Sequence, residues 1–326
     1  MTQISGFKIA MAAALAVMGL QTSADAQQVN YPQRPITLIA ATAPGGPGDT
    51  AARLIAEKMT PILGQQVVVE NAGGAGGALG AQRVALADPD GYTLLLHQTG
   101  LAVAPAINPN LTFNVRKDFV TVGLVNTSYF FLIGRETLPP KNFPELVAWV
   151  KSNPAKFAHP GVGSLGHLTT LLFANHAGAK PDLIVYRGIG PALNDLLGGH
   201  VDLLWPGAVA AAPLLKAGKV KGYAFGGKTR SKLAPDVPSV VELNAPELVT
   251  PFWHALFAPA ATPRPIVQKL NAALRQALAD PQLLKIYEET GVEAFPAEML
   301  TLEASQAFFE SEIERWRSTA TKIKIE

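Results

Sequence analysis

The sequence predicts an α/β protein of two similar lobes, each a mainly parallel sheet flanked by helices. Apolar strand-like runs alternate with helical patterns along the chain. The order strand, glycine loop, helix, turn, strand occurs twice, in residues 67–96 and 183–205. Two further apolar runs, 120–134 and 250–260, are long enough to cross from one lobe to the other. Because open parallel sheets bind ligands at the carboxyl ends of their strands, we expect a ligand cleft between the lobes.

Local patterns place the remaining elements in chain order. Short apolar runs bounded by glycine, proline or charged residues predict buried strands, and apolar residues three and four apart predict helices. A helix begins at Asp49, another begins with Pro265 in its first turn, and Asp280-Pro281 interrupts the C-terminal helical region. The strands expected on this basis are 36–42, 65–70, 93–98, 156–164, 183–190 and 201–205, of which 156–164 and 183–190 include the glycine loop that follows the strand. The expected helices are 49–63, 77–87, 143–154, 165–178, 191–200, 263–291 and 303–322.

The first 26 residues have the pattern of a secretory signal peptide. A lysine precedes twelve apolar residues, and Ala24-Asp25-Ala26 is a small-residue cleavage motif, so we expect cleavage after Ala26. Twelve apolar residues are too few to span a bilayer. The expected division of the chain is 1–26 signal peptide, 27–125 lobe 1 with 250–326 returning to it, 126–249 lobe 2, and a hinge near 124–128 and 249–253.

Composition limits the possible functions. The chain has 326 residues, of which 48% are hydrophobic, enough for one large or two medium cores. Its net charge is +2 without a basic run, so we expect no nucleic-acid partner. The absence of cysteine excludes thiol chemistry, and the six histidines lack metal-binding spacing, so we expect no metal and no cofactor. We expect a monomer.

The loop after the first strand, Gly46-x-Gly48-x-x-Ala51, is a candidate anion site. With Glu70 at the end of the next strand, it also matches the dinucleotide-binding pattern, so an exported NAD(P)-type oxidoreductase is one alternative. Pro44 and Pro47 stiffen the loop, which argues against that alternative. Backbone N–H groups at a helix N-terminus bind carboxylate or phosphate without a cation. Asp49 is expected to cap this helix.

Three further loops, 71–80, 97–102 and 159–167, repeat this arrangement. Thr99 and Ser164 would add hydroxyl donors. A second alternative is an esterase that uses Ser164, although the glycine that a nucleophile elbow needs two residues earlier is absent. Three histidines fall on expected cleft segments and are possible ligand donors: His97, His167 and His254. The other three are expected to cap helices or lie on the surface: His159, His176 and His200.

Two larger side chains end expected strands of lobe 2. Arg187 would pair with a ligand carboxylate or lie solvated at the cleft edge. Trp205, followed by Pro206, is expected to form a wall for an apolar or aromatic ligand body, and core packing is the alternative.

Several long segments carry a family resemblance. "YPQRPITLIAATAPGGPGDTAARLIAEKM", "LGQQVVVENAGGAGGALGAQRVALADPDGYTLL", "YRGIGPALNDLLGGHVDLLW" and "LFAPAATPRPIVQKLNAAL", in this order, resemble the tripartite tricarboxylate transporter substrate-binding proteins, the Bug family. The resemblance covers essentially the whole mature chain. It implies a two-lobed periplasmic binding protein (type II-like) in the periplasm. Such a protein closes on a small organic carboxylate and delivers it to integral membrane transporter subunits, without catalysis.

Carried over position by position, the resemblance implies a set of ligand-binding residues: Ala43, Pro44, Gly45, Gly46, Asp49, Gly74, Ala75, Thr99, Gly100, Gly163, Ser164, His167, Arg187, Trp205 and Pro206. Many members have Asp-Asn where this chain has Trp205-Pro206, and many have lysine where Arg187 stands. Losing an acid disfavours an amino-acid ligand, and gaining tryptophan favours a flatter one. We therefore expect a dicarboxylate, an aromatic one such as terephthalate first and aliphatic dicarboxylates next.

Overall fold

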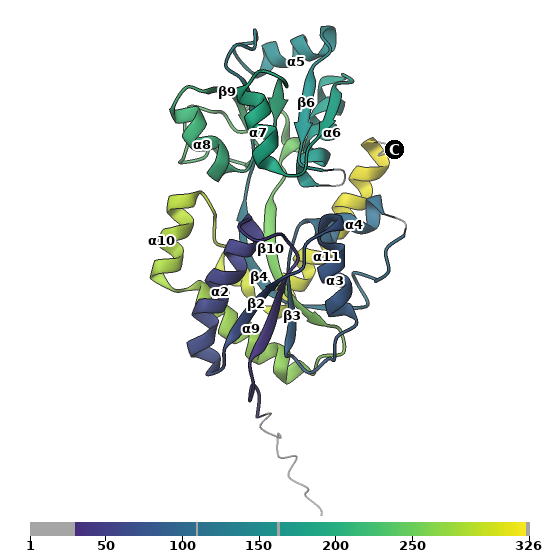
Figure 1. The fold of residues 1–326 in the computed structure, drawn as a ribbon, viewed down its shortest axis with the longest axis vertical. Helices are drawn as coiled ribbons and strands as arrows, with labels where there is room; N and C mark the ends of the chain where they lie inside the picture. The colour runs from purple at the N-terminus through teal and green to yellow at the C-terminus, as the bar shows by residue number, and fades with distance from the viewer. Residues whose placement is uncertain (1–29, 109, 162–163, 324–326) are drawn as a thin grey trace, which may run out of the picture. The chain divides into compact units, whose positions relative to one another are not determined.

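Two five-stranded sheets organise the chain (Figure 1). Their strand orders are β2-β1-β3-β10-β4 and β7-β6-β8-β5-β9. The first sheet contains β1 (Ile36–Ala40), β2 (Val67–Asn71), β3 (Thr93–Gln98), β4 (Phe119–Ser128) and β10 (Phe252–Pro259). The second contains β5 (Phe131–Arg135), β6 (Lys156–His159), β7 (Asp182–Val185), β8 (Leu203–Leu204) and β9 (Val220–Phe225).

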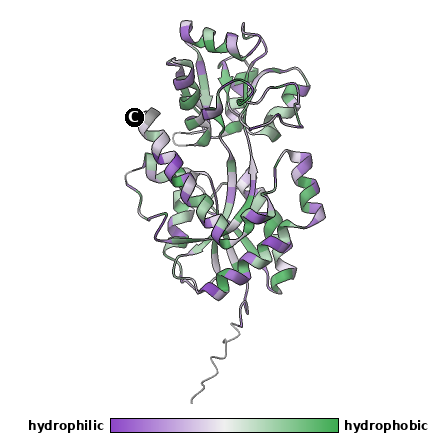
Figure 2. Cartoon of the chain, turned by 180° about the vertical axis from the view of Figure 1, so that it is seen from behind, coloured by the Kyte–Doolittle hydropathy of each residue, from purple (hydrophilic) through white to green (hydrophobic). Residues whose placement is uncertain are grey.

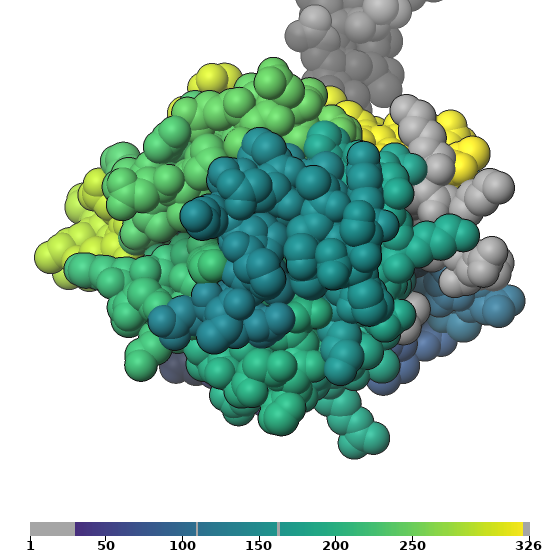
Figure 3. Space-filling model, turned by 90° about the horizontal axis from the view of Figure 1, so that it is seen from above, coloured from purple at the N-terminus to yellow at the C-terminus, as the bar shows by residue number. Residues whose placement is uncertain are grey.

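Helices flank both sheets. Lobe 1 is the first sheet with α2 (Pro47–Leu63), α3 (Ala78–Ala85), α4 (Gly100–Ile107), α9 (Arg264–Leu278), α10 (Pro281–Thr290) and α11 (Leu302–Ile323). Lobe 2 is the second sheet with α5 (Phe143–Ser152), α6 (Leu165–Ala177), α7 (Ile189–Leu197) and α8 (Ala208–Lys216). Short 3-10 turns are η1 (Ala75–Gly77), η2 (Pro246–Leu248) and η3 (Ala297–Leu300). Seen from above, the teal and green residues of lobe 2 cover most of the visible face (Figure 3).

This computed structural model describes residues 30–108, 110–161 and 164–323. The chain divides into two units, Met1–Tyr31 and Pro32–Glu326, and the fold described here is that of the second. The expected signal peptide and Gly163 lie outside the described residues. Within the described residues, no helix has both the length and the apolar composition needed to cross a membrane.

The two-lobed α/β class with mainly parallel sheets is confirmed: in each sheet four strands run in the same direction, and one strand, β10 or β5, runs against them. In lobe 1, β1 pairs in parallel with β2 and β3, but β10 pairs antiparallel with β3 and β4. In lobe 2, β6 pairs in parallel with β7 and β8, but β5 pairs antiparallel with β8 and β9. The physical reason is the connectivity: β5 and β10 each enter their sheet from the other lobe, and therefore run against the strands already there.

The two apolar runs expected to cross between the lobes are confirmed as strands. The first run forms β4 in lobe 1 and continues as β5 in lobe 2, and the second forms β10. Sequence patterns missed α4, α8 and β9, whose short segments contain proline or glycine. Asp49 is not the N-cap of α2, because Gly46 has that position and the helix already begins at Pro47.

Apolar burial holds each lobe together. On α2, Ile55 and Met59 are 0% and 1% exposed, as the helical spacing of apolar residues predicts. Leu95 on β3 and Phe157 on β6 are completely buried in the sheets. Green and purple alternate along the C-terminal helix α11 (Figure 2), and Trp316 lies on its buried face. Each fully buried side chain of this size contributes about 1.5–3 kcal/mol to folding.

Candidate functional site

The loop between β1 and α2 presents backbone donors at the carboxyl end of β1. Ala43, Pro44 and Gly45 are exposed, and Gly46 is half-buried as the N-cap of α2. No described residue accepts a hydrogen bond from the backbone N–H groups of Gly48 or Asp49 in the first helical turn. Unpaired N–H groups at the positive end of a 17-residue helix favour an anion.

Asp49 fixes the shape of this loop. Its carboxylate accepts hydrogen bonds from the Gly45 N–H at 2.9 Å and from the Asn71 Nδ2 at 2.9 Å, and pairs with Arg53 at 3.0 Å. Burial acts to raise the pKa of Asp49, but the hydrogen bonds from Gly45, Arg53 and Asn71 outweigh it and lower the pKa to about 2. The Asp49 side chain therefore stays ionised, and from its buried position it holds the loop in shape through these hydrogen bonds.

The loop after β2 lies beside the first one and has a strained backbone. Gly74 and Ala75 are exposed, and Ala75 has a left-handed φ of 49°. A non-glycine residue in this region costs about 1–2 kcal/mol, and such strain is concentrated at functional loops. Gly77, with φ of 98°, covers a buried ring: a Cβ there would lie 2.4 Å from the Nε2 atom of His97. Only glycine fits this position.

Thr99 is not a ligand donor in this structure. It is completely buried, and its hydroxyl donates to the carbonyl oxygen of Pro251 at 3.2 Å and accepts from the Trp253 N–H at 3.0 Å. The Thr99 N–H also donates to the Trp253 carbonyl at 3.0 Å. Thr99 therefore anchors the start of α4 to the strand that enters from lobe 2. Gly100 follows it at the first position of α4 and faces the Gly76 carbonyl.

Two buried imidazoles lie beneath these loops. Burial lowers the pKa of His97 to about 4, although backbone hydrogen bonds with Gln98 and Gly77 act to raise it. Burial and the nearby His97 lower the pKa of His254 to about 3. The Nδ1 atom of His254 lies 2.7 Å from Asn126 Oδ1, and its Nε2 atom has no hydrogen-bond partner among the described residues. Both rings are neutral at physiological pH, and neither adds a charge.

In lobe 2, Ser164 caps a helix. Its hydroxyl oxygen accepts from the His167 N–H at 3.2 Å and donates its proton to the Gly161 carbonyl at 2.7 Å. Because the proton is held by a carbonyl and not by a base, the arrangement is that of an N-cap, unlike an activated nucleophile. The same bond removes the expected hydroxyl donor for a ligand.

His167 and His159 stack on each other, with ring centroids 4.5 Å apart. Both are buried, which corrects the expectation of a surface or capping position for His159. Burial, and to a lesser degree His159, lowers the pKa of His167 to about 4, and burial also lowers the pKa of His159. The Nδ1 atom of His176, by contrast, lies 2.5 Å from Oε1 of Glu247, and His200 is exposed as expected.

Arg187 is the cation that lobe 2 offers at the carboxyl end of a parallel strand. It is exposed, lies two residues after the end of β7, and has no ion-pair partner in the described part of the chain. The next residues begin α7, where the N–H groups of Ile189 and Gly190 meet no acceptor among described residues. A guanidinium beside free helix N–H groups matches a carboxylate.

Trp205 and Pro206 belong to the core, which corrects the expected ligand wall. Trp205 is 1% exposed, and Pro206 is buried with its carbonyl accepting from the Phe131 N–H at 3.0 Å. Both residues directly follow β8 (Leu203–Leu204), which pairs antiparallel with β5. The indole ring therefore cannot contact a ligand in this conformation.

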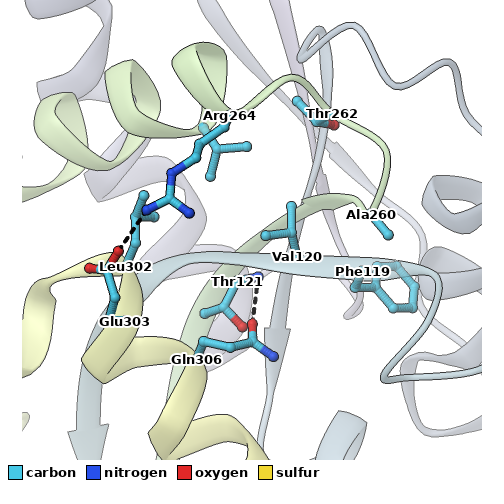
Figure 4. Close-up of a pocket in the computed structure, with 10 residues that line it drawn as sticks. Phe119, Val120, Thr121, Ala260, Thr262, Arg264, Leu302, Glu303 and Gln306 are labelled. Carbon is cyan, nitrogen blue, oxygen red and sulfur yellow. Dashed lines mark hydrogen bonds and ion pairs between the residues drawn. The ribbon is translucent and has the colours of Figure 1, made fainter.

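A separate hollow lies at the opposite end of the lobe 1 sheet (Figure 4). It has a volume of about 470 Å³ and is formed by the amino end of β4 and the first turns of α9 and α11. Apolar side chains such as Val120 line it, and at its rim Arg264 pairs with Glu303 at 3.0 Å. Because its two charges neutralise each other and the glycine loops lie at the other end of the strands, we do not assign the ligand to this hollow.

The loops of both lobes together provide uncharged N–H donors, neutral imidazoles and one exposed guanidinium. Such a set binds an acid without providing an activated nucleophile. Within the described residues, no three histidine, aspartate or glutamate side chains form a possible metal site. Sequence reasoning missed Asn71 and Asn126, which position Asp49 and His254; neither has a motif, because each acts through a partner distant in the chain.

Comparison with known proteins identifies the family. The model of the tripartite tricarboxylate transporter family receptor matches residues 51–325. A UPF0065 protein of Agrobacterium vitis, from the TAR-I ttuE-ttuC′ intergenic region, is 43% identical over 88% of this chain and 84% of its own length. Protein BugT of Bordetella pertussis is 35% identical over 90% of this chain and 92% of its own.

Solved structures agree. The periplasmic binding protein BugD superposes with a TM-score of 0.81 at 36% identity, over 91% of this chain and 99% of its own. MatC from Rhodopseudomonas palustris, solved with bound malate, superposes with a TM-score of 0.80 at 37% identity, over 89% of this chain and 99% of its own. R. palustris Rpa4515, solved with adipate, superposes with a TM-score of 0.79 at 28% identity, over 90% of this chain and 99% of its own. This chain thus belongs to the tripartite tricarboxylate transporter receptors, the Bug family of periplasmic solute-binding proteins.

Proposed function

We propose that this protein captures a small dicarboxylate in the periplasm and delivers it to the integral membrane subunits of a tripartite tricarboxylate-type transporter. The observation that carries the proposal is the combination of helix N–H groups without an acceptor among the described residues, in both lobes, with the exposed guanidinium of Arg187 next to the first turn of α7. One carboxylate would bind at the first turn of α2 and the other at Arg187 and the first turn of α7. The expected cleavage after Ala26 would release the receptor from its signal peptide.

An aliphatic dicarboxylate is favoured over an aromatic one. The case for terephthalate depended on Trp205 as a flat wall, and that side chain is 1% exposed. MatC was solved with malate and Rpa4515 with adipate, both aliphatic dicarboxylates. The described residues of these loops also offer no exposed acid to a ligand ammonium group, because the carboxylate of Asp49 is committed to Gly45, Asn71 and Arg53. An amino acid is accordingly a poor ligand.

Capture would occur by closure of the lobes about the two crossing segments. In the first, Ser128 still pairs with Phe252 of lobe 1, and Phe130 already pairs with Gly207 of lobe 2. In the second, Thr250 is bonded to Gly226 of lobe 2, whereas the next residue accepts from Thr99 of lobe 1. The bends would therefore fall at 128–130 and 250–251, next to or within the hinge regions expected from the sequence.

The family and the site favour a receptor over the two enzymes considered above. Ser164 lacks a base that could take its proton, because the Gly161 carbonyl holds it. Glu70, which a dinucleotide ribose would need, pairs with Arg83 at 2.5 Å. Purified protein should therefore show neither ester turnover nor bound-nucleotide absorbance.

A ligand panel tests the proposal. Protein freed of co-purified ligand by unfolding and refolding is titrated calorimetrically with succinate, malate, adipate, terephthalate, aspartate and glutamate. We expect an aliphatic dicarboxylate to bind best. Binding of aspartate or glutamate with no response to any of the diacids would refute the proposal.

A variant at Arg187 tests the assignment of the cation. Arg187→Gln should weaken binding of the best diacid about ten- to hundredfold, because a charged hydrogen bond contributes about 1.5–3 kcal/mol. Lys180→Gln, at another exposed cation of lobe 2, is the matched control and should leave the affinity unchanged. If Arg187→Gln and Lys180→Gln bind the diacid with equal affinity, Arg187 is not part of the binding site.

A further inference from the structure

The two lobes touch at a place outside the crossing segments. Gly291 follows α10 in lobe 1 with a left-handed φ of 66°. A Cβ on Gly291 would lie 2.4 Å from Leu233 Cδ1 and 3.6 Å from Ala208 Cβ, both in lobe 2. The Leu233 side chain therefore packs directly on the Gly291 backbone. We call this contact the clasp; it consists of Ala208, Lys232 and Leu233 on lobe 2 and Glu288 and Gly291 on lobe 1.

A charge pair borders the clasp. Lys232 Nζ lies 3.3 Å from Glu288 Oε1, and the two side chains are 88% and 71% exposed. Ion pairs as exposed as this one contribute little on their own. Figure 3 shows the yellow-green of α10 beside the green of the segment after β9, in agreement with this pair. The apolar contact of Leu233 is the main part of the clasp. The ion pair at its border means that the strength of the clasp can also be changed by substituting the charged side chains.

Strand order places the clasp on the far side of the crossing strands from the glycine loops. In lobe 1 these loops follow β1 and β2, whereas the chain next to the clasp pairs with the outer edge of β4: Thr127 and Glu293 exchange backbone hydrogen bonds of 2.9 and 2.7 Å. In lobe 2 they follow β6 and β7, whereas the segment around Leu233 continues along the outer edge of β9, where Ser239 pairs with Phe225. The crossing strands thus lie between the two regions.

We propose that the clasp opposes closure and thereby sets ligand affinity without touching the ligand. When the lobes approach each other on one side of the crossing strands, they separate on the other side, so closure must break the packing of Leu233 on Gly291. The inference rests on the proposed capture by closure. A clasp that favours the open form reduces the population competent to hold ligand, and the apparent dissociation constant rises by the same factor.

Weakening the clasp should therefore tighten binding. Leu233→Ala is titrated calorimetrically with malate and adipate, and we expect a dissociation constant about threefold lower than in the wild type. Leu197→Ala, at a leucine of lobe 2 that is 47% exposed, is the matched control and should leave the dissociation constant unchanged. An unchanged or weaker affinity of Leu233→Ala, with a native circular dichroism spectrum, overturns the proposal.

Charge reversal provides a test that does not alter the packing. Lys232→Glu places like charges at the clasp and should also tighten binding at low ionic strength. Adding Glu288→Lys restores opposite charges and should restore the wild-type affinity. If the single and the double variant bind alike, the clasp does not control affinity. Both residues are highly exposed, so these variants keep the test available even if Leu233→Ala fails to fold.

A ligand-free measurement separates this inference from the identity of the ligand. The chain has no cysteine, so Leu86→Cys in lobe 1 and Lys151→Cys in lobe 2 provide a unique pair of spin-label sites. Without ligand, Leu233→Ala should alter the interlobe distance distribution measured by pulsed electron resonance. An unaltered distribution overturns the clasp. If no panel compound binds but the distribution changes, the proposed ligand class fails and the clasp stands.

Discussion

Removing the charge of Asp49 should loosen the loop that opens α2. The change is Asp49→Asn, which keeps the shape of the side chain. An amide presents one oxygen where the carboxylate presents two, so it cannot accept from both the Gly45 N–H and Asn71 Nδ2 as the wild type does at 2.9 Å each. It also loses the ion pair with Arg53.

The magnitude follows from the pKa. A pKa lowered from 3.8 to about 2 means that folding favours the ionised form. One unit corresponds to about 1.4 kcal/mol, and screening at the half-exposed Arg53 reduces the sum, so we expect Asp49→Asn to lower the free energy of unfolding by about 1–2 kcal/mol at pH 7. Because the folded-state pKa is depressed, this stability is present above pH 3.8 and is lost as the pH falls toward 2.

Urea unfolding monitored by circular dichroism measures the difference. Wild type and Asp49→Asn are compared at pH 7, 5 and 3, and the gap between their unfolding free energies should narrow at the lowest pH. Asp195→Asn, at an aspartate whose Oδ2 accepts from the Tyr186 hydroxyl, controls for loss of a charge elsewhere. Equal stability of wild type and Asp49→Asn at pH 7, or a gap that does not change with pH, would refute the reasoning.

Thr99→Val should lower the free energy of unfolding by about 1–3 kcal/mol, because the buried Trp253 N–H loses its acceptor. Thr99→Ser should retain most of the stability, and urea titrations measure both variants. An unchanged free energy of unfolding in Thr99→Val would show that the hydrogen bond is not needed. Ser164→Ala should lower stability by about 1 kcal/mol through loss of the N-cap of α6, and Ser164→Asn should recover part of it. If the Ser164→Ala change instead abolishes an ester hydrolase activity, the capping role assigned here is wrong.

Local patterns predicted the fold where the determining contacts are close in sequence. The strand 93–98 matches β3, and the helix expected from 49 begins within two residues of α2, because apolar period and glycine-proline loops decide both. The antiparallel position of β10 was not predicted. It depends on pairing with β4, more than a hundred residues earlier in the chain, and no local pattern records such a partner.

The candidate site was predictable at the level of loops and less so at the level of side chains. Glycine spacing located the loops at 43–49 and 74–77, and the first of them leads into a helix turn whose Gly48 and Asp49 N–H groups have no acceptor among the described residues. The roles of Thr99 and Trp205 depended on what packs against them, and both are buried against neighbouring strands. A strand-end position is compatible with either a ligand contact or a core contact, and only the three-dimensional arrangement decides between them.

The neutral rings beneath the glycine loops have a consequence for the conditions in which the receptor works. His97, His167 and His254 have pKa values of about 4, 4 and 3, so in a medium between mildly acidic and mildly alkaline they take up no protons. Any decline of uptake within that interval would therefore come from protonation of the diacid and not from a change in these three rings.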